Sequence, residues 1–384
     1  MSEEKKTVTY KLSGRVESSN AADIEKDIDK TIEENPGSIL RFDASKLTYI
    51  SSAGLRILLK VRKNQGNLSI FNLSNDVYDI LEMTGFTEML DVERAYKTIT
   101  LKNCKKIGQG SNGAVYRLDP ETVIKVYFDP DSLPAIKRER ELAKYALISG
   151  IPTAISFEVV IADKMYGSVF ELLDTDSVSR LIIKNPKDLD TYVNMATDLL
   201  KKIHATEADT SKLPDAKARA LGWLADIKGK ISDSAYSKLD AMLNAVPDTK
   251  TIIHGDYHTN NIMVQKGEPI LIDMDTLSYG HPVFELGSSF LAYKGFSIVD
   301  HDVVKQFLGL DYDTAVEFWE KSLRRYFSKL SEKEIETIDK KVATLGYIRL
   351  LRRTYRRDAK NSALIEACRK NLEEAAESLE SLYF

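Results

Sequence analysis

The sequence is poor in cysteine and has neither a long apolar run nor an excess of basic charge. Its 384 residues include only two cysteines, Cys104 and Cys368, so neither a disulfide framework nor a cysteine-based metal site is expected. The opening MSEEKKTVTY lacks the apolar core of a signal peptide, and no window reaches the roughly 18 apolar residues of a membrane helix. The net charge of -4 disfavours a dedicated nucleic-acid binder. We therefore expect a soluble, cytoplasmic protein without a transmembrane segment and without a nucleic-acid partner.

Hydrophobic periodicity changes near residue 96, which predicts two domains. Before that point, apolar patterns of period 2 and period 3.6 alternate, with strands expected at 7–16, 38–43 and 68–71 and helices at 20–34, 53–63 and 77–83. This alternation predicts a small α/β domain over residues 1–95. The remainder, 96–384, reads as an α+β bilobal domain, with a β-rich lobe to about residue 173 and a helical lobe from about residue 174.

A glycine-rich stretch opens the second domain and is a candidate nucleotide-binding loop. The pattern G-x-G-x-x-G also fits a dinucleotide-binding turn, but that motif needs a following helix, whereas the residues AVYRL that come next alternate as a strand. A strand–turn–strand loop can lay backbone N–H groups over phosphates, although an ordinary hairpin has the same appearance. The candidate binding residues are Gly108, Gly110, Ser111, Asn112 and Gly113.

Lys125 follows on an apolar strand, TVIKV, and a charged helix comes after it. A lysine on a buried strand needs an anion to meet, so we expect contact with the nucleotide phosphates, the alternative being a solvent-facing edge lysine. Two glutamates on the helix could pair with it, Glu139 and Glu141. They point in nearly opposite directions, and Glu139 is favoured.

The segment IHGDYHTNNI carries the clearest catalytic pattern. An aspartate, Asp256, is followed five residues later by Asn261, the spacing at which kinases place the residue that orients the acceptor hydroxyl and a magnesium ligand. A second carboxylate, Asp273, ends the apolar strand LID. Mg²⁺ takes few protein ligands and fills its sphere with phosphate oxygens and water, so Asn261 and Asp273 suffice.

The segments HGDYHTNNIM, ILIDMDTLSYGHPVFELGSSF and LLKKIHAT closely resemble the aminoglycoside phosphotransferase and choline kinase superfamily of the protein-kinase-like fold. The resemblance implies an ATP site beneath the 108–113 loop, an adenine-binding hinge near Glu171 and Leu173, Asp256 as the catalytic aspartate, and Mg²⁺ held by Asn261 and Asp273. Where relatives commonly have aspartate in a D-P-x-x-D-L stretch, this chain has HPVFEL, which leaves the role of Glu285 open.

Two features favour a small-molecule acceptor over a protein. Protein kinases place arginine before the catalytic aspartate, and this chain has Gly255 there. Only 11 residues separate Asp273 from Glu285, too few for an activation loop.

Residues 7–92 resemble the STAS fold of sulfate transporters and anti-sigma factor antagonists, through LSGRVESSNAADI, ILRFDASKLTYISSAGLRILL and NLSNDVYDILEMTGFTEML. The resemblance implies a signalling partner protein and places a candidate phosphosite at Ser52. Ser51 stands where relatives usually have aspartate. Either serine also suits the N-cap of the following helix, and a phosphate at a helix start is compatible with capping.

Five arginines near the C-terminus share one helical face: Arg349, Arg352, Arg353, Arg356 and Arg357. The face is either solvated and paired with nearby acids or it recognises an anion. An anion-recognising face disfavours polycationic aminoglycosides as the acceptor.

The leading hypothesis is thus an ATP- and Mg²⁺-dependent kinase acting on a hydroxyl of a small molecule, linked to a STAS-like regulatory or partner-binding domain. The alternatives are a protein kinase that phosphorylates a STAS serine, and a non-catalytic module that senses nucleotide. Because Lys125, Asp256, Asn261 and Asp273 are all present, the last alternative has no support in the sequence.

Overall fold

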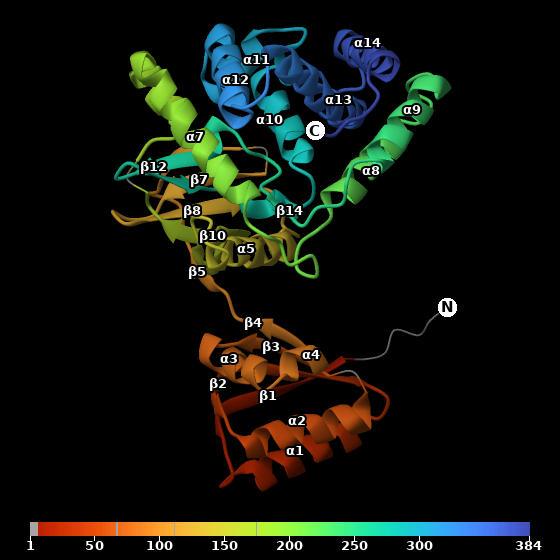
Figure 1. Ribbon diagram of the computed structural model, residues 1–384. Coiled ribbons are helices and arrows are strands. Elements are labelled where there is room, and N and C mark those ends of the chain that lie inside the picture. Colours follow the sequence, from red (N-terminus) through yellow and green to blue (C-terminus); the bar gives the residue numbers. More distant parts are fainter. Residues whose placement is uncertain (1–6, 67, 111, 174) are drawn as a thin grey trace. The chain divides into compact units, whose positions relative to one another are not determined.

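A computed structural model describes residues 7–66, 68–110, 112–173 and 175–384. Internal contacts divide the chain into two compact units, one of Met1–Leu101 with Val159–Lys164 and the other of Lys102–Glu158 with Met165–Phe384. Figure 1 shows the elements of each unit. None of the described helices combines the length and apolarity that crossing a membrane requires.

The first unit contains a four-stranded parallel sheet in the order β1-β2-β3-β4. Its strands and helices alternate along the chain: β1 (Thr7–Val16), α1 (Ala21–Glu33), β2 (Ile39–Ile50), α2 (Ser52–Gln65), β3 (Ser69–Leu73), α3 (Asn75–Met83), α4 (Phe86–Met89) and β4 (Asp91–Arg94). Side chains that alternate along β2 and β3, such as Phe42 and Ile70, are fully buried against helix residues such as Leu58 and Val77. The predicted α/β class is confirmed, although β2 runs seven residues beyond the predicted strand and β4 was not predicted.

A six-stranded sheet has the order β5-β9-β10-β8-β7-β6. Most of this sheet belongs to the second unit, whereas β5 and part of β9 are grouped with the first unit. The elements are β5 (Lys97–Ile99), β6 (Lys105–Gln109), β7 (Gly113–Arg117), β8 (Thr122–Tyr127), α5 (Leu133–Ile148), β9 (Ser156–Ala162) and β10 (Met165–Glu171). Strands β6, β7, β8 and β10 pair antiparallel, as the hairpin-like alternation predicted.

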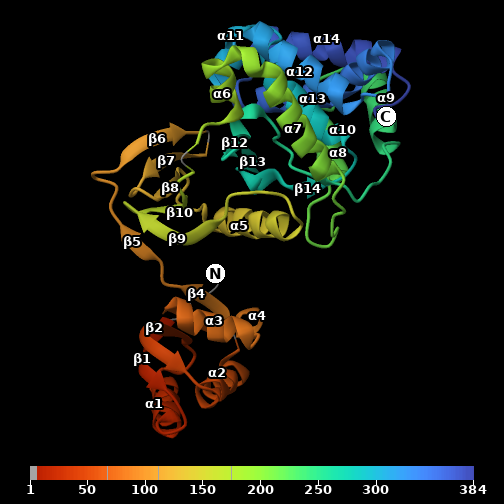
Figure 2. The ribbon, with the colours of Figure 1, turned by 60° about the vertical axis from the view of Figure 1, so that its left-hand side comes forward.

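The rest of the second unit is helical, apart from two small hairpins. The helices are α6 (Val178–Lys184), α7 (Leu189–His204), α8 (Ala216–Asp226), α9 (Asp233–Asn244), α10 (Val283–Tyr293), α11 (Asp302–Leu308), α12 (Tyr312–Tyr326), α13 (Glu332–Arg357) and α14 (Ser362–Ser378), and the strands are β11 (Ile252–Ile253), β12 (Ile262–Gln265), β13 (Glu268–Leu271) and β14 (Ser278–Tyr279). Figure 2 shows β12 and β13 between the strands of the sheet and the helices α10 to α14. The predicted bilobal α+β class is confirmed.

Helix α10 is the centre of the helical part, since every one of its residues is buried. Helix α13 crosses it closely at Gly287 and Gly346, where a Cβ on Gly346 would lie 3.0 Å from the carbonyl oxygen of Gly287. This close approach, which only small residues permit, brings the C-terminal half of α13 next to the chain that follows β11.

Candidate active site

The loop after β11 carries Asp256 and is held from several sides. Its neighbour Gly255 has φ +85°, and a Cβ there would lie 2.6 Å from the carbonyl oxygen of Thr276, so only glycine fits without strain. The hydroxyl of Thr276 donates to the His254 carbonyl at 2.7 Å, and the hydroxyl of Ser289 donates to the Tyr257 carbonyl at 2.8 Å. The glycine that the sequence offered as a contrast with protein kinases is therefore required by the turn itself.

The Asp256 carboxylate is one-third exposed and lies between two cationic or potentially cationic side chains. His258 Nε2 is 3.4 Å from Oδ2, and Arg349 Nη2 is 3.9 Å from Oδ1. Burial opposes ionisation, but the hydrogen bond and charge of His258, together with Arg349, outweigh it and hold the pKa of Asp256 well below its usual range. Asp256 is therefore an ionised acceptor of hydrogen bonds at neutral pH.

Asn261 and Asp273 offer oxygen ligands to a cation. The Asn261 side-chain amide donates from Nδ2 to the Asp256 carbonyl at 3.0 Å, so its oxygen is the atom left to bind. Asp273 follows β13 with φ 66°, in the left-handed region that aspartate tolerates better than most residues. The described residues contain no group of three or more His, Cys, Asp and Glu side chains arranged to hold a metal. One carboxylate and one amide oxygen fit Mg²⁺, which relies on phosphate oxygens and water for its other ligands.

Lys125 on β8 is anchored by two carboxylates from different parts of the chain. Its Nζ lies 3.1 Å from Glu139 Oε1 on α5 and 2.7 Å from Asp273 Oδ1. Burial lowers the pKa of Lys125, but the charges of Asp273 and Glu139 outweigh it, and the pKa is raised above its ordinary value. Lys125 is thus a fixed cation beside the proposed metal-binding carboxylate.

The structure distinguishes the two glutamates that the sequence left as competitors. Glu139 is buried and also accepts a hydrogen bond from the hydroxyl of Tyr127 at 2.8 Å, whereas Glu141 is exposed. Glu139 is therefore the partner of Lys125.

The glycine-rich loop joins β6 to β7. Gly113 is required by packing, because a Cβ would lie 2.4 Å from the Val126 carbonyl oxygen. Gly108 and Gly110 have no such neighbour: the nearest atom to a Cβ on Gly108 is 3.8 Å away, and nothing lies within 4 Å of one on Gly110. The Asn112 carbonyl accepts from the Phe128 N–H at 3.0 Å. Ser111 lies outside the described residues.

The predicted hinge lies where β10 ends at Glu171. Leu172 donates its N–H to the Glu121 carbonyl at 2.6 Å, and the Leu173 carbonyl accepts from Thr175 at 2.8 Å. Because α6 begins only at Val178, this short segment is the connection from the sheet to the helices.

Glu285, whose role the sequence left open, supports the loop that carries Asp256. It is completely buried on α10, accepts from the Gly255 N–H at 2.9 Å, and also accepts from the N–H of His254. Burial raises the pKa of Glu285 to about 7, against the lowering effect of these hydrogen bonds. The carboxylate is a positioning group: it satisfies two N–H groups directly before Asp256.

Three of the five arginines of α13 contact different partners, which the helical pattern could not distinguish. Arg352 and Arg356 approach Asp226 of α8, with nearest distances of 2.5 and 4.0 Å. Arg349 instead donates to the Gly255 carbonyl at 3.2 Å and to Ser288 Oγ at 2.8 Å.

Sequence reasoning missed Arg219 and Trp223 of α8, which lie beside Arg349. Both Arg219 and Arg349 place a guanidinium group over the Trp223 ring, at 5.6 and 5.4 Å from its centroid. The available signal was the i, i+4 spacing of an arginine and a tryptophan on one helix.

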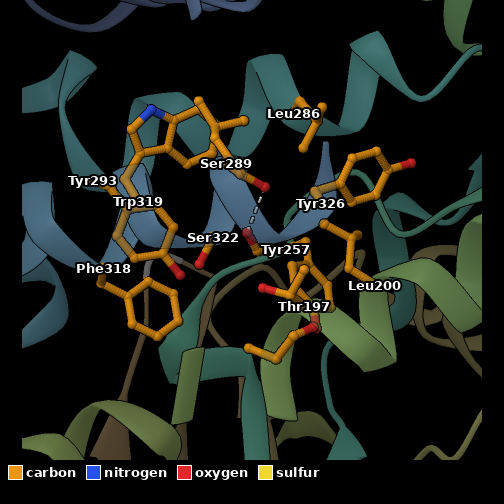
Figure 3. A pocket seen from close by; sticks show the side chains of 12 residues that line it. Thr197, Leu200, Tyr257, Leu286, Ser289, Tyr293, Phe318, Trp319, Ser322 and Tyr326 are labelled. Carbon is orange, nitrogen blue, oxygen red and sulfur yellow. Dashed lines mark hydrogen bonds between the residues drawn. The ribbon is translucent and has the colours of Figure 1, made fainter. Parts of the chain in front are cut away.

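A cavity of about 20 Å³ lies behind the catalytic loop, between α7, α10 and α12 (Figure 3). Tyr257, Tyr293 and Trp319 line it, and the buried hydroxyls of Thr197 and Ser322 have no hydrogen-bond partner in the described part of the chain. Such a volume accommodates about one water molecule. It is therefore too small to be a substrate pocket.

In the first unit, Ser51 is the N-cap of α2 and its hydroxyl accepts from the Ala53 N–H at 3.2 Å. Ser52, the predicted phosphosite, is the exposed first residue of that helix. The capping role thus falls to Ser51 and leaves the hydroxyl of Ser52 on the surface.

Comparison with known proteins matches both parts of the chain. Residues 103–319 match the profile of the phosphotransferase enzyme family, and residues 1–100 match the STAS domain. A putative anti-sigma factor antagonist, BtrV, from Bordetella bronchiseptica is 34% identical over 85 residues, which cover 21% of this chain and 72% of that protein. An anti-sigma-B factor antagonist from Listeria monocytogenes is 28% identical over 61 residues, 15% of this chain and about half (54%) of the relative.

Among solved structures, the ADP-bound aminoglycoside phosphotransferase APH(2'')-Ib aligns with a TM-score of 0.50 at 15% identity, covering 74% of this chain and 95% of the other. A thermostable mutant of aminoglycoside phosphotransferase APH(4)-Ia, in a ternary complex with AMP-PNP and hygromycin B, aligns with a TM-score of 0.50 at 12% identity, covering 73% and 94%. These alignments support the fold.

Proposed function

This chain belongs to the phosphotransferase enzyme family and carries a STAS domain, and from that premise we propose that it transfers the γ-phosphoryl group of ATP to a hydroxyl of a small molecule, with Mg²⁺ as cofactor. The observation that carries the proposal is the convergence of Lys125, Glu139 and Asp273. In the loop after β11, the side-chain amide of Asn261 donates a hydrogen bond to the backbone carbonyl of Asp256. Phosphoryl transfer needs positioning and charge stabilisation more than covalent chemistry from the protein.

Each group has a role that follows from its position. Lys125 would contact the nucleotide phosphates. Asn261 and Asp273 would hold Mg²⁺, which neutralises phosphate charge when bound. Asp256 would orient the acceptor hydroxyl and take its proton as the new P–O bond forms and the bond to ADP breaks. The ionised state of Asp256 suits this role, because an ionised carboxylate accepts the hydroxyl hydrogen bond before transfer.

The open space around Gly108 and Gly110 supports a phosphate-binding role for the loop. Since the fold does not require glycine at either position, small residues there leave room for a ligand above the backbone. Two structurally similar enzymes were solved with ADP and AMP-PNP, which favours ATP as the donor here. We propose that Glu171 and Leu173 contact the adenine as the hinge.

For the STAS domain we propose a partner-binding role, as in the anti-sigma factor antagonists that it resembles. Phosphorylation at Ser52 would place negative charge at the N-terminus of α2, where the helix dipole favours it. We place the boundary between the two domains near residue 96.

Incubation of the full-length protein with Mg-ATP and panels of hydroxyl-bearing small molecules tests the proposal, with mass detection of the small products and of the protein. We expect an increase of one phosphoryl group on a small molecule. Phosphate appearing on Ser52 or another serine of the protein, with no small-molecule product, would favour the protein-kinase alternative.

A further inference from the structure

Three arginines gather on the side of Asp256 that faces α8 and α13. Arg349 is the nearest, 3.9 Å from the carboxylate. Arg353, one turn further along α13, lies over the ring of Phe296 at 5.0 Å from its centroid. Arg219 reaches the same region from α8 and shares the Trp223 ring with Arg349.

The acidic groups nearest to this region, Asp256, Asp275 and Glu285, act on these arginines mostly from beyond ion-pair distance. Asp226 contacts Arg352 and Arg356, which lie on another side of α13. In the part of the chain that the structure describes, no carboxylate oxygen lies within 4.0 Å of Arg219 or Arg353, and Arg349 approaches only the proposed catalytic carboxylate. Among the described residues, two of the three guanidinium groups therefore form no ion pair.

Hydrogen bonds within the protein use only part of the donor capacity of the cluster. Arg219 donates to the Thr276 carbonyl at 3.3 Å and to Ser278 Oγ at 2.9 Å, but its buried Nε has no partner. Burial, together with the charge of Arg349, lowers the pKa of Arg219. Burial also lowers the pKa of Arg353, and the charges of Arg357 and Arg349 add to this effect. Like charges kept together in this way are unfavourable unless an anion joins them.

A structural role accounts for Arg349 and for part of Arg219, whose bonds to Thr276 and Ser278 hold α8 to the chain after β13. Its bonds to the Gly255 carbonyl and Ser288 fix the catalytic loop against α10. Arg353 has no such bond among the described residues, and an apolar residue at 353 would avoid the repulsion by Arg349 and Arg357. Paired guanidinium groups on aromatic rings are well suited to bind planar or tetrahedral oxyanions.

Resting on the phosphotransferase function proposed above, we propose that the acceptor carries an oxyanion, a carboxylate or a phosphate, in addition to its reactive hydroxyl, and that Arg219, Arg349 and Arg353 bind this group beside Asp256. The anion would satisfy the unpaired donors, and the hydroxyl on the same molecule would reach Asp256. Trp223 and Phe296 supply the apolar walls of the site.

The test uses full-length protein saturated with Mg²⁺ and a non-hydrolysable ATP analogue, so that the nucleotide phosphates already occupy the groups around Lys125. Inorganic phosphate is then titrated and followed by calorimetry and by the fluorescence of Trp223. We expect saturable binding that Arg353→Gln and Arg219→Gln each weaken by about tenfold to a hundredfold, the usual effect of losing a hydrogen bond to a charged group. Arg356→Gln, on the same helix but next to Asp226, is the matched control and should bind phosphate as the wild type does.

Absence of saturable phosphate binding overturns the inference, and so does equal weakening by Arg356→Gln, which would indicate a diffuse basic surface. A second arm compares glycerate, glycerol 3-phosphate, glycerol and 3-amino-1,2-propanediol as competitors of phosphate. Competition by the two anions alone supports the inference, and competition by the amine contradicts it. Failure of the protein to bind the ATP analogue at the outset would instead count against the proposed function.

Discussion

Nζ of Lys125 lies 2.7 Å from Oδ1 of Asp273, although the two residues are 148 positions apart in sequence. The pair joins strand β8 of the sheet to the turn after β13, and Glu139 of α5 closes the cluster. The groups proposed to meet the phosphates and the metal are therefore joined to one another by ion pairs.

Substitution of Lys125 should weaken both nucleotide binding and the fold. Lys125→Gln removes the proposed phosphate contact and leaves buried Glu139 with only Tyr127 as partner. We expect ATP affinity, measured by calorimetry, to fall at least about tenfold. The free energy of unfolding should fall by about 1–3 kcal/mol, less than for a fully buried pair because Lys125 is partly exposed.

Lys137→Gln is the control for this change, because Lys137 is exposed on the same helix as Glu139. It should leave both quantities within error of the wild type. Wild-type ATP affinity in a folded Lys125→Gln protein would show that this lysine is structural only.

Replacing Asp256 by asparagine should abolish transfer while sparing nucleotide binding. The amide keeps the shape of the side chain but cannot take the acceptor proton, and loss of such help typically costs 10²–10⁴-fold in rate, an order-of-magnitude range. The measurement is turnover with a verified acceptor, beside calorimetry with Mg-ATP. Turnover of half the wild-type rate or more would remove Asp256 from its assigned role.

The metal assignment predicts that Asp273→Ala loses the dependence of nucleotide affinity on Mg²⁺. In the wild type, raising Mg²⁺ at fixed ATP should tighten binding, since the carboxylate links the metal to the phosphates. In Asp273→Ala, low and high Mg²⁺ concentrations should give the same weak affinity for ATP. The exposed aspartate Asp313 of α12 provides a control, Asp313→Ala, that should retain the wild-type response.

The fold classes and the order of the kinase-like residues were predictable because they rest on local patterns. Alternating apolar residues identify strands, and Asp256, Asn261 and Asp273 lie close together along one hairpin. Helical geometry predicted that only one of Glu139 and Glu141 can face β8 and favoured Glu139, and the structure shows that Glu139 is the residue that meets Lys125.

What the sequence could not provide were contacts between distant segments. Glu285 caps two N–H groups that lie 30 and 31 residues earlier, and nothing local to HPVFEL indicates this. The arginines of α13 share one face in the pattern, yet α8 and α10 pack against different parts of that face. Their division into a set near Asp226 and a set near Asp256 therefore depends on tertiary packing.

A partly buried histidine should make the second unit sensitive to acid. His204 Nδ1 is 2.7 Å from the Tyr326 hydroxyl, and burial, aided by the charge of His281, lowers the pKa of His204 to about 3. Between pH 6.5 and this value the unfolded chain binds a proton that the folded protein does not, so stability is complete above pH 6.5 and declines as the pH falls. The slope is at most about 1.4 kcal/mol per pH unit.

The measurement is urea unfolding at pH 7.5 and pH 5.0, followed by tryptophan fluorescence, since Trp223 and Trp319 both lie in the second unit. His204→Gln should reduce the difference between the two pH values by about 2 kcal/mol. The exposed His301→Gln is the matched control. Equal reduction in both variants would show that His204 is not the responsible group.

Removal of the STAS domain should leave the chemistry in place. Every residue proposed to bind nucleotide, metal or acceptor has a number of 108 or higher, so a protein of residues 96–384 retains all of them. It also retains β5, so that β9 keeps its parallel neighbour. We expect the truncated protein to fold, as judged by circular dichroism and cooperative urea unfolding. It should bind Mg-ATP within about threefold of the full-length affinity, a difference of roughly 0.7 kcal/mol.

Turnover with a verified acceptor is the second readout, and it reports any influence of the STAS domain on the rate. A truncated protein that is folded by both criteria but binds no nucleotide would mean that the first domain completes the active site, and the proposed division between a partner-binding domain and a catalytic domain would be wrong.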